Sequence, residues 1–150
     1  MHVVEDTLDT DLETFLARPL FAHLSTVDGT DPRESPVWFL WEEDALWVVG
    51  DSEADSFPVR VEADPRCAVG IVDYDRGTGR VEHVGFRGRA TVEPFDPERV
   101  TRLLRRYLGP NEARWDARFS GALERSTSVL LRFVPETAVL RDQSYAPAFD

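Results

Sequence analysis

Apolar and polar residues alternate along much of the chain, in short runs. This pattern predicts β-strands, because successive side chains of a strand point to opposite faces of a sheet. Turn-forming pairs such as Asp28-Gly29 separate the runs, as expected between antiparallel strands. Pro135 interrupts the last run, since proline cannot donate a hydrogen bond to a neighbouring strand. The predicted strands are residues 20–27, 34–41, 45–49, 67–72, 81–92, 128–134 and 137–140.

Four other segments have apolar residues spaced three and four apart, which predicts short amphipathic helices. The third has the clearest ends: Asp96 can cap it, Pro97 fits its first turn and Gly109-Pro110 ends it. Its polar side carries four arginines in a position that ordinarily faces solvent, namely Arg99, Arg102, Arg105 and Arg106. The predicted helices are residues 11–18, 57–64, 97–108 and 111–119.

This arrangement of elements favours a mainly β (α+β) fold. About six antiparallel strands in so short a chain suit a small closed or nearly closed barrel with short helices inserted between the strands. No internal repeat is visible. The chain has 150 residues, of which 42% are hydrophobic, and we therefore expect one globular domain over residues 1–150.

Composition restricts the possible location and chemistry. No run of about 18 apolar residues and no charged-then-apolar leader is visible, so we expect a cytoplasmic protein without a membrane partner. Cys67 is the only cysteine, which excludes an internal disulfide and a multi-cysteine zinc site. His2, His23 and His83 are too scattered for metal-ligand spacing, so no metal is expected.

The charge of the chain narrows the function classes further. The formal net charge is −11, which disfavours binding to DNA or to an anionic membrane, since both need a basic surface. All seventeen basic residues are arginine, so a lysine Schiff base is excluded. The chain also lacks a Gly-x-Gly-x-x-Gly run, a Walker sequence and a recognisable nucleophile turn, and no catalytic residue can be identified.

Five segments in a particular order resemble the pyridoxamine 5′-phosphate oxidase-related family. They are LSTVDG (24–29), SPVWFLWEEDALWVV (35–49), a serine-containing loop and helix, DPRCAVGIVD (64–73) and GFRGRATVE (85–93). The resemblance extends from about residue 12 to residue 108. It implies the split β-barrel fold that binds FMN.

The resemblance also implies a homodimer with two flavin sites at the subunit interface, each built from both chains. In such proteins the second strand lays its backbone along the isoalloxazine ring, which here corresponds to Pro36, Val37, Trp38 and Phe39. The end of the third strand and the following loop hold the ribityl phosphate. In this chain that loop runs from Asp51 to Phe57.

The loop departs from the family pattern. Spacing places the family's basic residues at Ser56 and Phe57, whereas three acids stand close by, Asp51, Glu53 and Asp55. An unpaired acid near a phosphate costs on the order of a few kcal/mol at an effective dielectric near 20. The loop is therefore either a modified phosphate site or the remnant of one.

Other groups could offset the missing cations. The hydroxyls of Ser52 and Ser56 and the backbone N–H groups of the short helix can donate hydrogen bonds to a phosphate. Arg60, one turn further along, is the predicted replacement cation. The three acids could also share the outer side of the strand end and so point away from the ligand.

Two further groups of residues permit alternative interpretations. Trp38, Trp41 and Trp47 on adjacent strands could pack against each other or stack on a ligand. Arg87 and Arg89 share a strand face, where they could be solvated or reach a phosphate, and Arg87 is the better candidate ligand.

We therefore predict a flavin-dependent oxidoreductase that acts on an unidentified small molecule. FMN or a related deazaflavin would supply the hydride chemistry, which needs no side-chain nucleophile. The alternative is a non-catalytic split-barrel binding protein that has lost or altered the flavin phosphate site. A nucleic-acid-binding module is disfavoured by the net charge and by the lack of an RNA-binding motif.

Overall fold

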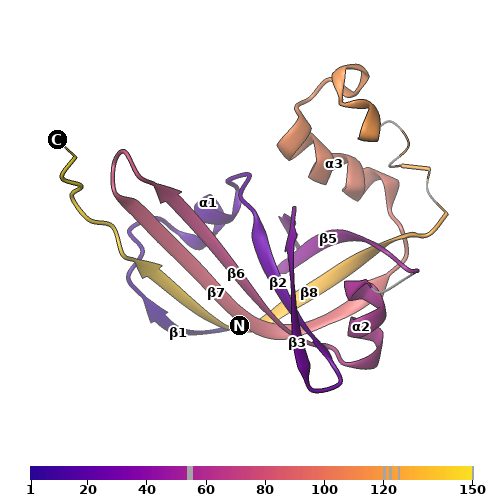
Figure 1. The fold of residues 1–150 in the computed structure, drawn as a ribbon, viewed down its shortest axis with the longest axis horizontal. Coiled ribbons are helices and arrows are strands. Elements are labelled where there is room, and N and C mark those ends of the chain that lie inside the picture. The colour runs from indigo at the N-terminus through magenta and orange to yellow at the C-terminus, as the bar shows by residue number, and fades with distance from the viewer. Residues whose placement is uncertain (54–55, 120, 122, 125, 150) are drawn as a thin grey trace.

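One strongly curved sheet organises the protein in the computed structural model, which describes residues 1–53, 56–119, 121, 123–124 and 126–149 (Figure 1). The sheet order is β3-β2-β6-β7-β8-β5-β4, and β1 pairs in parallel with β8 beside this path. All other pairings are antiparallel. The strands are β1 (His2–Asp6), β2 (Ala22–Asp28), β3 (Asp31–Val37), β4 (Leu40–Glu42), β5 (Ala45–Asp51), β6 (Arg66–Asp75), β7 (Arg80–Glu93) and β8 (Ser128–Asp142).

The helices are inserted between strands, as predicted. They are α1 (Leu12–Leu16), α2 (Phe57–Ala63) and α3 (Pro97–Leu108), followed by the 3-10 turns η1 (Glu112–Arg114) and η2 (Ala117–Phe119). Figure 1 shows α3 and the turns after it standing away from the sheet on the side opposite the β6–β7 hairpin. None of the described helices is long and apolar enough to cross a membrane.

The two end strands of the sheet, β3 and β4, follow each other in the chain. The predicted strand 34–41 is therefore divided: β3 ends at Val37, β4 begins at Leu40, and Trp38 and Phe39 lie between them. No pairing joins β3 to β4 among the described strands. The sheet is consequently a barrel that stays open along one side, at the position of these two residues.

Strand β8 is continuous although Pro135 was expected to split it. Pro135 pairs with Gly88 of β7, and the register shifts between Arg87 and Gly88. A bulge of this kind accommodates a proline because one residue is left out of the ladder of hydrogen bonds. A Cβ atom on Gly88 would lie 2.1 Å from the Val134 carbonyl oxygen, so only glycine fits this close approach of the two backbones.

The predicted helix over residues 111–119 is wrong. Asn111 does cap a turn, since its side chain accepts from the Ala113 N–H, but the turn is η1 and ends after one winding. Trp115 then takes an extended conformation and its indole Nε1 donates to the Gly109 carbonyl at 2.9 Å. The contact with the end of α3 replaces helix continuation. Strand β1, which the sequence pattern did not predict, forms through its pairing with β8.

The apolar residues form two clusters. The larger fills the barrel and includes the fully buried Phe15, Phe39, Phe86 and Phe133. The smaller lies between the barrel and α3, and is made of Leu40, Ala45, Trp47, Val100, Leu103, Leu104 and Leu130. The alternating strands thus bury one face inside the barrel, while the other face of β4, β5 and β8 receives α3.

Candidate functional site

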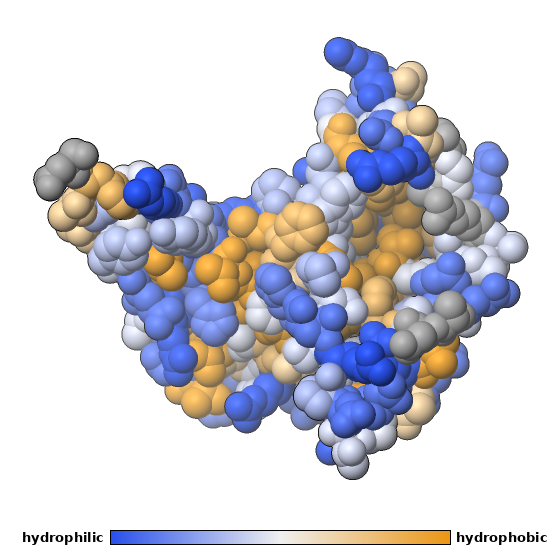
Figure 2. All heavy atoms as spheres, viewed as in Figure 1, coloured by the Kyte–Doolittle hydropathy of each residue, from blue (hydrophilic) through white to orange (hydrophobic). Residues whose placement is uncertain are grey.

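A pocket of about 610 Å³ lies between α3 and the open side of the barrel. Figure 2 shows a hollow with a hydrophobic floor beneath the α3 segment. Its volume falls within the range of small-molecule and cofactor sites. The described residues that line it are Phe21, Pro36, Val37, Trp38, Val48, Val49, Phe57, Leu103, Leu104, Arg118, Phe119 and Ser128.

Helix α3 forms one wall of the pocket because its apolar side faces the barrel. Leu103 and Leu104 are buried in the smaller cluster and also line the pocket. Asp96 caps the helix by accepting from the N–H groups of Glu98 and Arg99. Gly109, with φ of 92°, ends it in a conformation that favours glycine. Within these bounds, the period of the helix puts Leu103 and Leu104 on the side that faces the strands.

Trp38 forms an aromatic wall at the gap between β3 and β4. Its ring stacks on Tyr107 with centroids 4.6 Å apart and on Phe119 with centroids 5.5 Å apart. The Tyr107 hydroxyl accepts from the Phe39 N–H at 3.1 Å and donates to the Leu20 carbonyl at 2.8 Å. Burial raises the pKa of Tyr107, so this hydroxyl stays protonated and keeps its donor role. The Tyr107 hydroxyl therefore ties this wall to the backbone of Phe39, within the gap, and to the backbone of Leu20, before β2.

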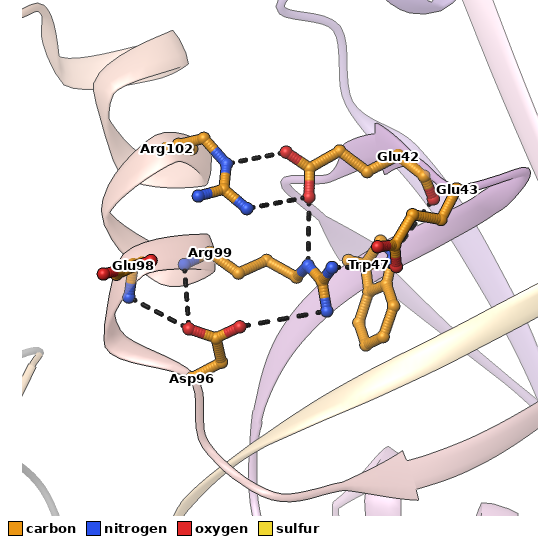
Figure 3. A network of polar contacts seen from close by, with 7 residues as sticks. All are labelled: Glu42, Glu43, Trp47, Asp96, Glu98, Arg99 and Arg102. Atoms are coloured by element: carbon orange, nitrogen blue, oxygen red, sulfur yellow. Dashed lines mark hydrogen bonds and ion pairs between the residues drawn. The ribbon is translucent and has the colours of Figure 1, made fainter.

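Ion pairs tie the first half of α3 to the β4–β5 hairpin (Figure 3). Glu42 accepts from Arg99 Nε at 3.0 Å and from Arg102 Nε and Nη2 at 2.6 and 3.0 Å. Arg99 also lies over the Trp47 ring at 3.8 Å and donates to Glu43 at 2.9 Å. We call Glu42, Arg99 and Arg102 the helix clamp.

The second half of α3 is tied to the barrel by Arg106. Its Nη2 donates to the carbonyls of Leu16 and Arg18 at 3.1 and 2.9 Å. The four arginines of α3 were expected to face solvent, and for Arg99 and Arg106 this is wrong, because both are partly buried against the barrel. Their bonds hold the helix in place as a wall of the pocket.

Four of the ten predicted cofactor residues line this pocket. Pro36 and Val37 end β3, Trp38 follows directly after it, and Phe57 begins α2. Phe39 does not join them, because its side chain is fully buried in the barrel core.

Three residues of the predicted phosphate loop bond within the loop or to Thr127, which lies directly before β8. Asp51 accepts from the Glu53 N–H and from the Thr127 hydroxyl, and the Ser56 hydroxyl donates to the Asp51 carbonyl at 2.7 Å. The Ser52 N–H donates to the Thr127 carbonyl at 2.8 Å. Asp51, Ser52 and Ser56 are not among the described residues that line the pocket. Asp55 lies outside the described residues.

The two arginines that were predicted to bind the phosphate, Arg60 and Arg87, also lie outside the described pocket lining. Arg60 Nε donates to the hydroxyl of Thr26, a buried residue of β2, at 2.9 Å. Arg87 is exposed on the face of β7 opposite the buried Phe86. Neither is among the described lining residues. Of the three tryptophans with two interpretations, Trp41 stacks on Phe86 and Trp47 packs under Arg99, whereas Trp38 lines the pocket.

Sequence analysis missed eight lining residues: Phe21, Val48, Val49, Leu103, Leu104, Arg118, Phe119 and Ser128. Val48 and Val49 belong to a strand that was predicted, and the two leucines to a predicted helix. Only Arg118 and Ser128 among the described lining residues carry polar side chains. No local signal marks either, since both reach the pocket through the fold of segments after α3. No group of three or more residues suited to a metal ion occurs in the described part of the chain.

Comparison with solved structures places this architecture among known folds. A conserved hypothetical protein from Mycobacterium tuberculosis has a TM-score of 0.74 at 17% identity, covering 100% of this chain and 98% of that one. An F420 reductase has a TM-score of 0.67 at 24% identity, covering 87% and 98%. A protein from Listeria innocua, provisionally assigned as a pyridoxamine 5′-phosphate oxidase, has 0.64 at 20%, covering 89% and 96%.

These likenesses establish the fold. The chain is a mainly β split barrel of the kind found in pyridoxamine 5′-phosphate oxidase-like proteins, so the resemblance inferred from the sequence is confirmed at the level of the fold. No protein-family model and no curated protein matches the chain.

Proposed function

We propose that the protein binds a flavin-type cofactor in the pocket between α3 and the open side of the barrel. The observation that carries the proposal is the pocket itself: about 610 Å³, walled by Trp38, Phe57 and Phe119, with Arg118 at its edge. A flat apolar ring system fits such walls through burial and aromatic stacking. The similarity to an F420 reductase and to an assigned pyridoxamine 5′-phosphate oxidase supports the same ligand class.

The finer proposal is an oxidoreductase that uses FMN or a deazaflavin on a small molecule. When bound, the cofactor would supply hydride transfer, and the chain would supply binding, orientation and exclusion of water. Val48, Val49, Leu103 and Leu104 would shield the ring from water. The described lining contains no lysine, cysteine or histidine, which agrees with chemistry that resides on the cofactor.

We further propose that the single domain works as a homodimer. Phe21, at the edge of the pocket, is 54% exposed, and Val72 and Tyr74 on the outer face of β6 are 47% and 55% exposed. A second copy would cover apolar surface of this kind. Light scattering at micromolar concentration should give twice the mass of one chain. A monomer would contradict this part of the proposal.

Absorbance and fluorescence test the ligand. The freshly purified protein, or the protein after addition of FMN or a deazaflavin, should show a bound flavin with quenched or shifted emission. Val49→Trp fills the pocket and should weaken binding at least about tenfold, because a ring-sized side chain occupies the ligand's volume. Val4→Trp, which adds the same bulk at an exposed position of β1 that is not among the described lining residues, is the matched control and should bind as the wild type does.

Two outcomes would contradict the proposal in different ways. If no flavin or deazaflavin binds, the protein does not use a flavin-type cofactor and the proposal fails. Binding that Val49→Trp leaves unchanged would place the flavin elsewhere. If flavin binds in the pocket but is not reduced by any hydride donor or substrate, the non-catalytic binding protein becomes the better function.

Haem is a different flat ligand, and the described lining offers it no histidine, cysteine or methionine for iron ligation.

A further inference from the structure

Arg118 is the one charged side chain among the described residues that line the pocket. It lies in η2, directly before Phe119, whose ring stacks on Trp38. The Arg118 guanidinium carbon is 5.5 Å from the centre of the Phe119 ring. The charge is thus held next to the aromatic wall that a flat ligand would contact.

The guanidinium is accessible to a ligand. The Arg118 side chain is 80% exposed, and its Nε forms an ion pair with Asp116, two residues away, at 3.2 Å. An exposed pair of this kind contributes little stability, so a ligand can compete for the guanidinium at low cost. Hydrogen bonds from the Arg118 backbone and side chain lower the pKa of Asp116. Asp116 is therefore ionised at neutral pH and competes with any anion for Arg118.

Other arginines near the pocket have described partners that hold them elsewhere. Arg99 and Arg102 belong to the helix clamp, Arg105 pairs with Glu112 at 2.8 Å, and Arg106 bonds two backbone carbonyls of the barrel. Arg60 bonds Thr26. In a protein with a net charge of −11, the position of Arg118 determines which end of the pocket favours an anion.

We propose that Arg118 binds the anionic group of the pocket's ligand and that Asp116 competes for the same guanidinium. The ligand class is a flat aromatic ring system with a phosphate or carboxylate on its side chain. A guanidinium suits both anions, because its donors match a pair of anionic oxygens. This inference rests on the proposed function and adds the residue that distinguishes an anionic flavin from a neutral one.

Paired titrations of FMN and riboflavin test the inference, since the two share the ring and differ in the phosphate. Wild type should bind FMN at least about tenfold more tightly than riboflavin, the preference expected from one charge-assisted hydrogen bond. In Arg118→Gln the preference should fall to about twofold or less, with riboflavin affinity unchanged. Arg118→Lys should restore part of it. Arg114→Gln removes the same charge from a residue of η1 that is not among the described lining residues and is the matched control.

Asp116→Asn tests the competition in the opposite direction. Freeing the guanidinium and removing a negative charge should strengthen FMN binding about threefold or more and leave riboflavin unaffected. A deazaflavin titrated with and without its acidic side chain shows whether a carboxylated ligand, rather than a phosphate, uses the same residue. The preference should shrink at high salt, because the site is exposed.

The results separate the inference from the function. Equal FMN preference in wild type and Arg118→Gln would overturn the role of Arg118 while the flavin site stands. An unchanged preference in Asp116→Asn would overturn the competition. If neither FMN, riboflavin nor a deazaflavin binds, the proposed function fails and the inference fails with it.

Discussion

Replacing Glu42 with Gln should weaken the attachment of α3 to the β4–β5 hairpin, while the side chain at position 42 keeps nearly the same size. Within the helix clamp, Glu42 accepts three hydrogen bonds, one from Arg99 and two from Arg102. The Arg99 side chain is 14% exposed and that of Arg102 is 46% exposed. Gln retains one carbonyl acceptor but loses the charge, and its amide N–H groups would face the guanidinium donors. The clamp is therefore a polar link of the first half of α3 that a conservative substitution weakens.

The size of the effect follows from the exposure of the partners. A hydrogen bond to a charged group contributes about 1.5 kcal/mol or more where it is shielded from water, as at Arg99. The exposed Arg102 pair contributes about 0.5 kcal/mol. Glu42→Gln should therefore lower the free energy of unfolding by about 2 kcal/mol, which corresponds to a decrease in Tm of about 4 to 8 °C for a domain of this size.

The dependence on pH provides a second test. Hydrogen bonds from Arg102, followed by those from Arg99, lower the pKa of Glu42 below its ordinary value of 4.5 in the folded protein. A carboxyl whose pKa is depressed by folding stabilises the fold above the unfolded pKa and loses that effect as pH falls through the folded one. The Tm difference between wild type and Glu42→Gln should be constant from neutral pH down to about pH 5 and should then shrink.

Thermal unfolding followed by circular dichroism measures both effects. Glu43→Gln is the matched control, because Glu43 is adjacent to Glu42, is 68% exposed and pairs with Arg99 at 2.9 Å. Its Tm should stay within about 1 °C of wild type, because exposed pairs contribute little. Equal Tm values for the two variants would show that the clamp does not hold α3. The same conclusion would follow if the Tm difference between wild type and Glu42→Gln were as large below pH 4 as at neutral pH.

Two further predictions concern the barrel. Gly88→Ala should lower the free energy of unfolding in urea by about 2 kcal/mol or more, because its Cβ would lie 2.1 Å from the Val134 carbonyl oxygen. Gly70→Ala is the control and should change the free energy of unfolding little, because the space around the added Cβ is open. Equal urea midpoints for the two variants would contradict the bulge geometry. Cys67 should react with a thiol reagent at about pH 8 at least about a hundredfold more slowly in the folded than in the urea-unfolded protein, since burial raises its pKa to about 11. Labelling at similar rates would show that β6 opens readily.

The regular elements of the barrel are predictable from the sequence. Strands β5, β6 and β7 begin and end within a few residues of the segments that alternation indicated, and α3 has the predicted bounds. Local patterns suffice there because one face of each element is buried and its cap or turn residues are adjacent in the chain. The order of five such segments was also enough to indicate the split barrel, which the solved structures confirm as the fold.

The candidate site was predictable only in part. Pro36, Val37, Trp38 and Phe57 were expected at a ligand and do line the pocket, but Arg60 was expected beside them and instead bonds Thr26. Spacing along a helix indicates how far apart two residues are, and it does not indicate which buried hydroxyl a long side chain will reach. The predicted helix over 111–119 failed for a related reason, because a bond from the Trp115 indole to the end of α3 competes with continuation of the helix.

Local sequence patterns were enough to predict most of the strands and the helix α3, whereas a ligand at the end of β3 stays a prediction. The fold, in contrast, brings α3 back over the gap between β3 and β4, and it brings Trp38 and Arg118, far apart in the sequence, to the same pocket. The difference comes from the range over which each interaction acts along the chain. Periodicity and capping act between neighbours in the chain, whereas the pocket exists because side chains distant in sequence exclude water together.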